Sequence, residues 1–342
     1  GMLRFNTDIG RLEVWRNDHW ATILGESPNL GDQNNSNSTG GTGTRAVFCR
    51  GNSNGPTVNR NTIDYITIPT LGNAQDFGDD IVTARQGGAL SSSTRALIAG
   101  RDSVSTAISF ITFASTGDAT NFTGTLTAST GASPAGISNS TRGIFAGGIA
   151  PTATTKMDYV TIASNQDAKD FGDLSEARDS PFGCASSVRG IVAGGYAPSP
   201  GSKFASIDYI TFSTTGNAQD FGDMTTGTDN ASMASNATRG IFGGGRSPGI
   251  TATIEFITIA STGNAQDFGD LLQIRGGGRG AASSTRMVFG GGYNPSNSPL
   301  NDFTNGAIEY VEISTTGNGQ GFGDLTVNRE QCPGASNGHG GL

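Results

Sequence analysis

Short segments in which apolar and polar residues alternate recur along most of the chain. A period of two predicts β-strands, because successive side chains of a strand point to opposite faces. The six segments are IDYITI from Ile63, ISFITF from Ile108, MDYVTI from Met157, IDYITF from Ile207, IEFITI from Ile254 and IEYVEI from Ile308. Both faces of each segment carry apolar residues, which predicts strands packed between two neighbouring sheets.

Each alternating segment follows a short apolar strand that begins with arginine. The six copies read TRAVFCRG, TRALIAGR, TRGIFAGG, VRGIVAGG, TRGIFGGG and TRMVFGGG. Their arginines are Arg45, Arg95, Arg142, Arg189, Arg239 and Arg286, at steps of 50, 47, 47, 50 and 47 residues. The chain therefore contains six units of nearly constant length, which together cover roughly residues 44–338.

A third segment completes each unit after a turn of the type STGNAQ. It is a short strand centred on a phenylalanine: Phe77, Phe122, Phe171, Phe221, Phe268 and Phe322. We predict that these rings pack between adjacent sheets, because they recur at one position in every unit. Five of them continue as Phe-Gly-Asp, with Asp79, Asp173, Asp223, Asp270 and Asp324; the second unit reads Asn-Phe-Thr-Gly instead.

Six units of about four short strands predict an all-β chain folded as a six-bladed β-propeller. Small, polar segments before the arginine strands, such as FGCASSVR from Phe182, predict the innermost strand of each blade. No such copy precedes Thr44, but CPGASNG from Cys332 matches this segment. We predict that this C-terminal strand completes the first blade and removes its open edge. It would bring Cys332 near Cys49. The sequence leaves open whether these two cysteines form a disulfide or stay free thiols.

The strand that ends in Gly-Gly resembles the diglycine strand of kelch repeats. The pairs are Gly147-Gly148, Gly194-Gly195 and Gly291-Gly292, and an aromatic residue, Tyr196 or Tyr293, follows two of them. Two features depart from the kelch pattern: Phe stands where the family usually has Trp, and the first two units have only one glycine of the pair. The resemblance implies a kelch-like propeller over residues 44–342.

The N-terminal segment lies outside the repeat and contains both tryptophans. LRFN, RLEVW and HWATI, separated by the turns TDIG and RND, predict a small three-stranded β-meander over residues 1–23, and 24–43 predict a Gly/Ser/Asn linker. The meander resembles a module of bacteriophage tail fibres, and the TGNAQDFGDL units resemble those of marine phage virion proteins. These resemblances imply a virion protein, associated with the tail, that contacts other virion proteins and trimerises through the N-terminal module.

Composition and charge limit the classes of partner that we expect this chain to bind. Glycine accounts for 53 of 342 residues and charged residues for 15% of the chain, which suits short strands and tight turns. The formal net charge of −8 argues against nucleic acid, whose binding needs clustered Lys and Arg. No apolar stretch approaches the roughly 20 residues of a membrane span, so we expect no membrane insertion.

Enzymatic and metal chemistry find little support in the residues. Copper-radical kelch oxidases need two histidines and a Tyr cross-linked to Cys, but the only histidines are His19 and His339, in the N-terminal segment and the C-terminal tail. The Asp boxes of sialidases are missing. We therefore predict a non-enzyme with no cofactor. Calcium stays an alternative at Asp79-Asp80 and the Asn/Asp-rich turns, although solvated turn caps are the favoured interpretation.

The repeated arginines occupy one equivalent position in every unit, which favours a structural role. We predict that each pairs with the aspartate of Phe-Gly-Asp through a bidentate contact. The second unit tests this hypothesis, because it retains Arg95 and lacks the aspartate.

These patterns predict a phage virion protein whose propeller binds a host-surface glycan or receptor through blade loops. Variable loops on a rigid scaffold commonly carry recognition residues, and the candidates are Tyr196, Arg246, Tyr293 and Asn294. Two alternatives stay open: a purely architectural virion protein, and an enzyme that acts on polysaccharides.

Overall fold

The structure, a computed structural model, describes residues 3–6, 11–16, 19–22, 44–54, 57–101, 105–127, 132–149, 151–199, 201–296 and 304–342. The described residues form β-strands and turns, with no helix among them. The chain divides into two compact units, Gly1–Gly43 and Thr44–Leu342.

The first unit contains a three-stranded antiparallel sheet of β1 (Leu3–Asn6), β2 (Arg11–Arg16) and β3 (His19–Thr22). β2 is the central strand, and Trp15 lies opposite Trp20 in its pairing with β3. The predicted linker, 24–43, lies outside the described residues.

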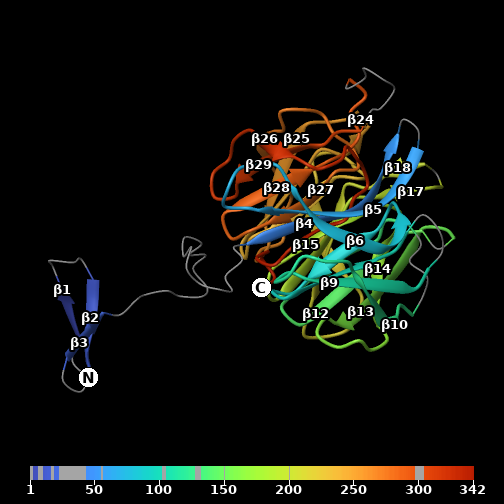
Figure 1. Ribbon diagram of the computed structural model, residues 1–342. Coiled ribbons are helices and arrows are strands. Elements are labelled where there is room, and N and C mark those ends of the chain that lie inside the picture. Colours follow the sequence, from blue (N-terminus) through green and yellow to red (C-terminus); the bar gives the residue numbers. More distant parts are fainter. Residues whose placement is uncertain are drawn as a thin grey trace. The chain divides into compact units, whose positions relative to one another are not determined.

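The second unit is a β-propeller of six four-stranded antiparallel blades (Figure 1). From the inner to the outer strand, blade 1 is β31 (Gly334–Ser336), β4 (Arg45–Asn54), β5 (Thr57–Thr67) and β6 (Gln75–Ala84); blade 2 is β7 (Gly88–Ser91), β8 (Arg95–Ala99), β9 (Ala107–Thr112) and β10 (Thr120–Thr125); blade 3 is β11 (Ala135–Ser138), β12 (Arg142–Ala146), β13 (Thr154–Thr161) and β14 (Lys169–Arg178). Blade 4 is β15 (Phe182–Ala185), β16 (Arg189–Ala193), β19 (Ser206–Thr211) and β20 (Gln219–Asp223); blade 5 is β21 (Ser232–Ser235), β22 (Arg239–Gly243), β25 (Thr253–Thr258) and β26 (Gln266–Asp270); blade 6 is β27 (Arg279–Ala282), β28 (Arg286–Gly290), β29 (Ala307–Glu312) and β30 (Gln320–Asp324).

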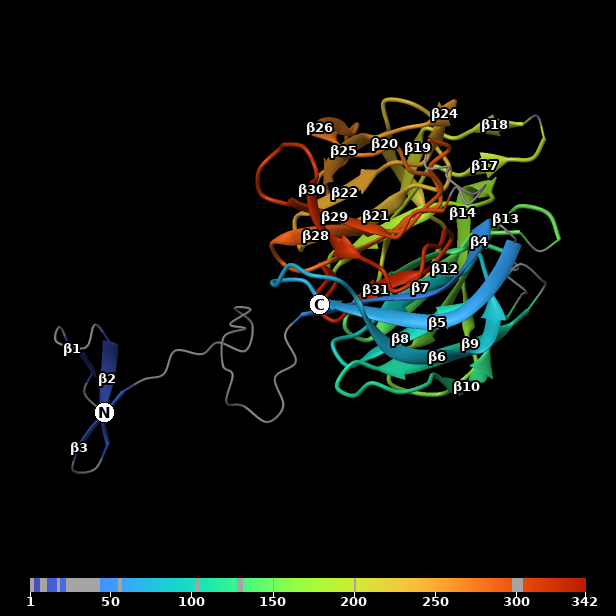
Figure 2. The same ribbon diagram turned by 45° about the horizontal axis from the view of Figure 1, so that its top comes forward.

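The ring closes through the C-terminal strand, as predicted. β31 pairs with β4 and places Gly334 opposite Phe48 and Ser336 opposite Ala46. Figure 2 shows this red strand beside the blue strand from the other end of the propeller sequence. The first blade thus gains its inner strand from the C-terminal end of the chain, and β4 is paired on both edges like the second strand of every other blade.

The closure also brings two cysteines into the same region. The backbone N–H of Cys49 donates to the carbonyl of Pro333 at 2.8 Å, next to Cys332. Both cysteines are buried free thiols, so the disulfide that the sequence left open is not formed. Burial raises the pKa of both thiols, and raises the pKa of the third free thiol, Cys184, to about 12.

The core lies between the blades. Phe77 of blade 1, for example, packs with Phe113 and Ala119 of blade 2 in one buried cluster. The six repeated phenylalanines are 2–5% exposed, and each meets an aromatic ring of its own third strand edge-on at 6.0–6.4 Å. Their predicted packing between adjacent sheets is confirmed.

The predicted pairing of the repeated arginines with the Phe-Gly-Asp carboxylates is wrong. Each arginine instead lies over an aromatic ring of the third strand, 4.5–4.7 Å from the ring centroid. Its guanidinium then reaches the next blade, where Arg45, for example, donates to the carbonyl of Phe113 at 2.7 Å. Arg95 makes the same stack in the blade that lacks the aspartate. A cation–π contact and a hydrogen bond to a backbone carbonyl of the next blade therefore fix the positions of these arginine side chains.

The aspartates of Phe-Gly-Asp contact the next blade through their backbone N–H groups. The N–H of Asp79 donates to the side-chain oxygen of Asp118 in the turn of blade 2 at 2.9 Å. Gly78 precedes it with φ +141°, and a Cβ there would lie 2.5 Å from the backbone of Gly117. The equivalent N–H groups of Asp173, Asp223, Asp270 and Asp324 donate to Asn217, Asn264, Asn318 and Asn73. The repeated Gly-Asp and Gly-Asn sequences thus form one seam between neighbouring blades.

Buried carboxylates on the third strands form a second seam. They are Asp64, Asp158, Asp208, Glu255 and Glu309, each at most 6% exposed. Each accepts a backbone N–H from the preceding blade, donated by Thr326, Thr127, Ser175, Thr225 and Leu272. Three also form ion pairs with buried arginines: Arg329–Asp64, Arg178–Asp208 and Arg275–Glu309. The alternation predicts that these acids share a face with apolar residues, but it does not reveal their partners.

Candidate functional site

The connections on the two faces of the propeller differ in how much their sequence and length vary among the six blades. The hairpin face carries the turns between third and fourth strands, which read TLGNAQ, STGDAT, SNQDAK, TTGNAQ, STGNAQ and TTGNGQ. The loop face carries the connections between second and third strands, which differ in sequence and length. Blades 4 and 5 add small ribbons there: β17 (Tyr196–Ala197) with β18 (Ser202–Lys203), and β23 (Arg246–Ser247) with β24 (Gly249–Ile250). Variable connections on a rigid scaffold favour recognition at the loop face.

Three of the four predicted binding residues occupy equivalent places on this face. Tyr196, Arg246 and Tyr293 each follow a diglycine pair directly, and each side chain is half-buried. Both glycines of each pair have positive φ, between +60° and +118°, a conformation that glycine adopts most readily. Isolated backbone bridges join the three residues to Asp179, Asp229 and Gly276. The structure therefore places these candidates side by side on three consecutive blades of the loop face.

Asn294, the fourth candidate, has a different environment. It is only 5% exposed, and its amide donates to the side-chain oxygen of Gln273 at 3.2 Å. Its own side-chain oxygen accepts the backbone N–H of Ser296 at 2.9 Å. Asn294 thus holds the conformation of its loop and is poorly placed to contact a ligand.

A ring of residues with left-handed backbone surrounds the loop-face end of the channel. We call Gln86, Ser133, Ser180, Asn230, Gly277 and Gln331 the mouth ring; their φ values lie between +50° and +70°. Backbone bonds connect consecutive members: Asn230 to Ser180 at 3.3 Å, Gly277 to Asn230 at 2.9 Å, Gln331 to Gly277 at 2.7 Å and Gln86 to Gln331 at 3.3 Å. Sequence reasoning missed this ring, whose signal is a polar residue or glycine just before each inner strand.

Three side-chain oxygens of the mouth ring lack a protein partner. The Oγ of Ser133, the Oδ1 of Asn230 and the Oε1 of Gln331 are buried and accept no hydrogen bond from the described residues. Leaving a buried polar group unpaired costs about 1–3 kcal/mol. Such groups are normally satisfied by water or by a bound polar molecule, so the mouth ring is suited to contact either.

Charges of both signs lie around the mouth ring. Lys203 forms an ion pair with Asp229 at 3.1 Å, and burial raises the pKa of Asp179 despite the hydrogen bond from Ser180. Arg279 lines the channel just inside and has no ion pair with any described residue; burial lowers the pKa of its guanidinium. A site with carboxylates, cations and amides together can both donate to and accept from hydroxyl groups.

The channel itself is too narrow to hold a sugar. Its walls are glycine, alanine, serine and a few larger residues of the six inner strands, and its two cavities measure about 50 and 40 Å³. Sites for small organic ligands usually span about 300–1,000 Å³. On this axis, only the mouth ring and the loops offer a surface wide enough to contact a molecule larger than these cavities.

Serines fix the inner strands to one another at the other end of the channel. The hydroxyl of Ser91 donates to the carbonyl of Ser336 at 2.7 Å, and that of Ser138 to the carbonyl of Ser91 at 2.8 Å. Ser235 and Ser336 donate in the same way to Ala185 and Ala282. Four of the six contacts between neighbouring inner strands thus carry a side-chain hydrogen bond, which stiffens the ring.

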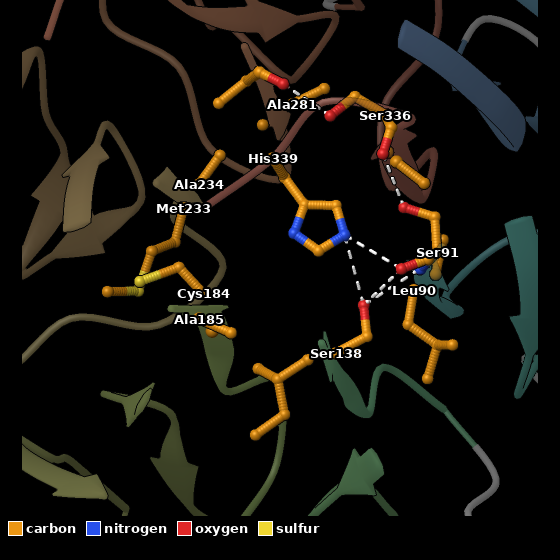
Figure 3. Close-up of a pocket in the computed structure, with 18 of the residues that line it drawn as sticks. Leu90, Ser91, Ser138, Cys184, Ala185, Met233, Ala234, Ala281, Ser336 and His339 are labelled. Atoms are coloured by element: carbon orange, nitrogen blue, oxygen red, sulfur yellow. Dashed lines mark hydrogen bonds between the residues drawn. The ribbon is translucent and has the colours of Figure 1, made fainter. Parts of the chain in front are cut away.

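The C-terminal tail covers this end of the channel. His339 lies in the centre of the pocket, among side chains of the inner strands (Figure 3). Its Nε2 lies 2.9 Å from the carbonyl of Ser91, and its Nδ1 accepts the N–H of Gly341 at 3.1 Å. These partners require a neutral ring with the proton on Nε2. The tail therefore closes the hairpin-face end, and the mouth ring is the other end of the axis.

His339 predicts a pH dependence of stability. Burial lowers the pKa of His339 below its ordinary value, because the charged ring would lose its acceptor at Nδ1 and its solvation. The unfolded chain then binds the proton more strongly, so the contribution of His339 is complete above about pH 6.5 and is lost as the pH falls below it. In thermal unfolding between pH 7.5 and 5, we expect the midpoint of the wild type to fall more than that of His339→Gln. Equal falls would contradict this prediction.

Neither a metal site nor a membrane span emerges from the described residues. No three His, Cys, Asp or Glu side chains there form a group that could hold a metal ion, so the calcium alternative gains no location. None of the described segments is a helix with the length and hydropathy needed to cross a membrane. No protein-family model matches the chain, and no curated protein shows significant sequence similarity to it.

Proposed function

We propose that the chain is a tail-associated bacteriophage virion protein whose kelch-like propeller binds a host-surface glycan or receptor through the loop face. The observation that carries the proposal is the contrast between the faces. The hairpin face repeats nearly the same turn six times, whereas the loop face combines variable loops with the polar mouth ring. Tyr196, Arg246 and Tyr293 follow the second strands of blades 4, 5 and 6 beside that ring and supply aromatic and charged contacts.

The virion assignment rests on the N-terminal module and the repeat. Residues 1–23 resemble a phage tail-fibre module, and a sheet of only three short strands gains stability when it packs against further protein. Other virion proteins or a trimer of this module would supply that packing. Thr44, the first residue of the propeller unit, lies against Gly338 on the hairpin face.

Binding of the purified full chain to bacterial cells and their polysaccharides tests the proposal. The labelled chain is titrated against a panel of bacteria and extracted surface polysaccharides, with and without calcium. We expect saturable binding that one polysaccharide competes, and at least a tenfold rise in Kd for Arg246→Ala. Asp267→Ala, an exposed change on the outer strand of blade 5 outside the loop face, is the matched control and should bind as the wild type does.

Two other outcomes would overturn the receptor assignment. Release of sugar products would indicate a polysaccharide-acting enzyme, for which Asp179, Asp229 and Glu330 near the mouth ring are the carboxylates to substitute first. An absence of binding across a panel that includes the host would indicate the architectural alternative. Copurification with virion proteins would then identify the neighbours.

A further inference from the structure

Two equivalent clefts lie on the hairpin face, in blades 1 and 4. The blade-1 cleft has a volume of about 400 Å³ and is lined by Arg45, Tyr65, Thr67, Thr70, Asn73 and Gln75, among others. The blade-4 cleft has a volume of about 370 Å³ and is lined by Arg189, Tyr209, Thr211, Thr214, Asn217 and Gln219 at the same repeat positions. Both volumes fall in the range of small-ligand sites, unlike those of the channel cavities.

The polar side chains of each cleft are held in place before any ligand binds. The hydroxyl of Tyr65 donates to the Oε1 of Gln75 at 2.5 Å, and Tyr209 donates to Gln219 at the same distance. The guanidinium of Arg45 lies over the ring of Tyr65, as that of Arg189 lies over Tyr209. Because these side chains are already ordered, they would lose little conformational entropy when a ligand binds.

The remaining hydrogen-bonding groups determine the ligand chemistry. The protein uses the oxygens of Gln75 and Asn73, which leaves both amide NH₂ groups without a partner among the described residues. The hydroxyl of Thr67 adds a group that can donate or accept. The guanidinium of Arg45 already has partners, since it lies over the ring of Tyr65 and donates to the carbonyl of Phe113. Neutral amides and hydroxyls beside a guanidinium that the protein already uses match the hydroxyl groups of a neutral saccharide.

The complete set of side chains occurs only in these two units of the sequence. Blades 2 and 5 have Phe110 and Phe256 in place of the tyrosine, and blade 3 has Lys169 in place of the glutamine. Blade 6 retains Tyr310 and Gln320 but has a glutamate in place of the threonine. That residue, Glu312, forms an ion pair with Arg286 at 2.6 Å and occupies the guanidinium. The repeat therefore provides two complete sites, three blades apart and on opposite sides of the axis.

We propose that the blade-1 and blade-4 clefts each bind one short stretch of a neutral, hydroxyl-rich saccharide. Two sites on one face allow a polysaccharide to engage both, which raises the overall affinity without new contacts. This binding is separate from the receptor site of the loop face, because the two lie at opposite ends of the propeller axis.

The test is a glycan array of neutral mono- to tetrasaccharides, followed by calorimetric titration of the best ligand into the full chain. We expect two equivalent sites per chain. Gln75→Leu and Gln219→Leu should each reduce the stoichiometry from two to one, and the double variant should abolish binding. Gln266→Leu makes the same change beside Phe256 in blade 5 and is the matched control, with an expected stoichiometry of two.

A second pair of variants blocks the clefts without removing the hydrogen bond between tyrosine and glutamine. Thr70→Trp and Thr214→Trp fill the clefts from exposed turn positions and should give the same losses, with unchanged circular dichroism. The proposal is overturned if no neutral saccharide binds at millimolar concentration, or if one site remains in both double variants. Loss of binding in Arg246→Ala alone would likewise overturn it while supporting the loop-face receptor site.

Discussion

A chain that lacks Cys332–Leu342 is expected to lose its cooperative unfolding transition and to aggregate. The deletion removes β31, the inner strand of blade 1, and exposes the edge of β4 together with Val47 and Phe48, which are fully buried. An unpaired strand edge beside newly exposed apolar side chains promotes association between chains. Thermal unfolding and size-exclusion chromatography measure both effects.

The matched control is a chain that ends at Gly338. It retains β31 and loses only the tail that carries His339, so we expect a folded monomeric propeller with a lower unfolding midpoint. The comparison separates closure of the ring from closure of the channel. A soluble, cooperatively folded Cys332–Leu342 deletion would show that β31 is dispensable and would contradict the prediction.

Asp64→Ala is expected to destabilise the propeller by about 3–5 kcal/mol. Asp64 and Arg329 are both fully buried and form an ion pair at 3.0 Å between blade 1 and the segment that follows blade 6. The substitution leaves the guanidinium charged, because arginine keeps its proton in proteins. It also removes the acceptor for the backbone N–H and hydroxyl of Thr326. Urea unfolding at constant pH measures the change.

The double variant Asp64→Leu, Arg329→Met distinguishes an unpaired charge from a loss of packing. Replacing both members by apolar residues is often close to neutral, so we expect most of the lost stability to return. Asp173→Asn, which breaks the exposed pair with Lys156, is the control and should change stability far less. A double variant no more stable than Asp64→Ala would contradict the charge argument.

Local patterns in the sequence were sufficient for the strands and the closure of the ring. The alternation in segments such as IDYITI specifies a strand because side-chain direction has a period of two. The spacing of the arginines counts the units, and the match between CPGASNG and GCASS identifies the strand that β4 lacks. Each of these signals lies within one unit or is a copy of it, so a single sequence contains it in full.

The partners of the polar side chains were decided by the tertiary structure. Arg45 bonds to Phe113, 68 residues away, and Arg329 pairs with Asp64 from the other end of the propeller. The sequence suggested the nearest repeated acid, Asp79, because it shares the unit with Arg45. The side chain of Asp79 is exposed on the outer strand, and Arg45 stacks on Tyr65 instead.

For the candidate sites, too, some features follow from the sequence and others only from the tertiary structure. The sequence by itself determined six blades, their strands and the loop residues Tyr196, Arg246 and Tyr293, because periodicity and turn chemistry act over a few residues. Only the tertiary structure decided that the mouth ring assembles from six separate segments, that His339 closes the opposite end and that the repeated polar side chains of blades 1 and 4 line clefts on the hairpin face. The physical reason is that the seams, the channel and the clefts depend on how one blade packs on the next. The pattern of a single repeat does not specify these contacts between blades.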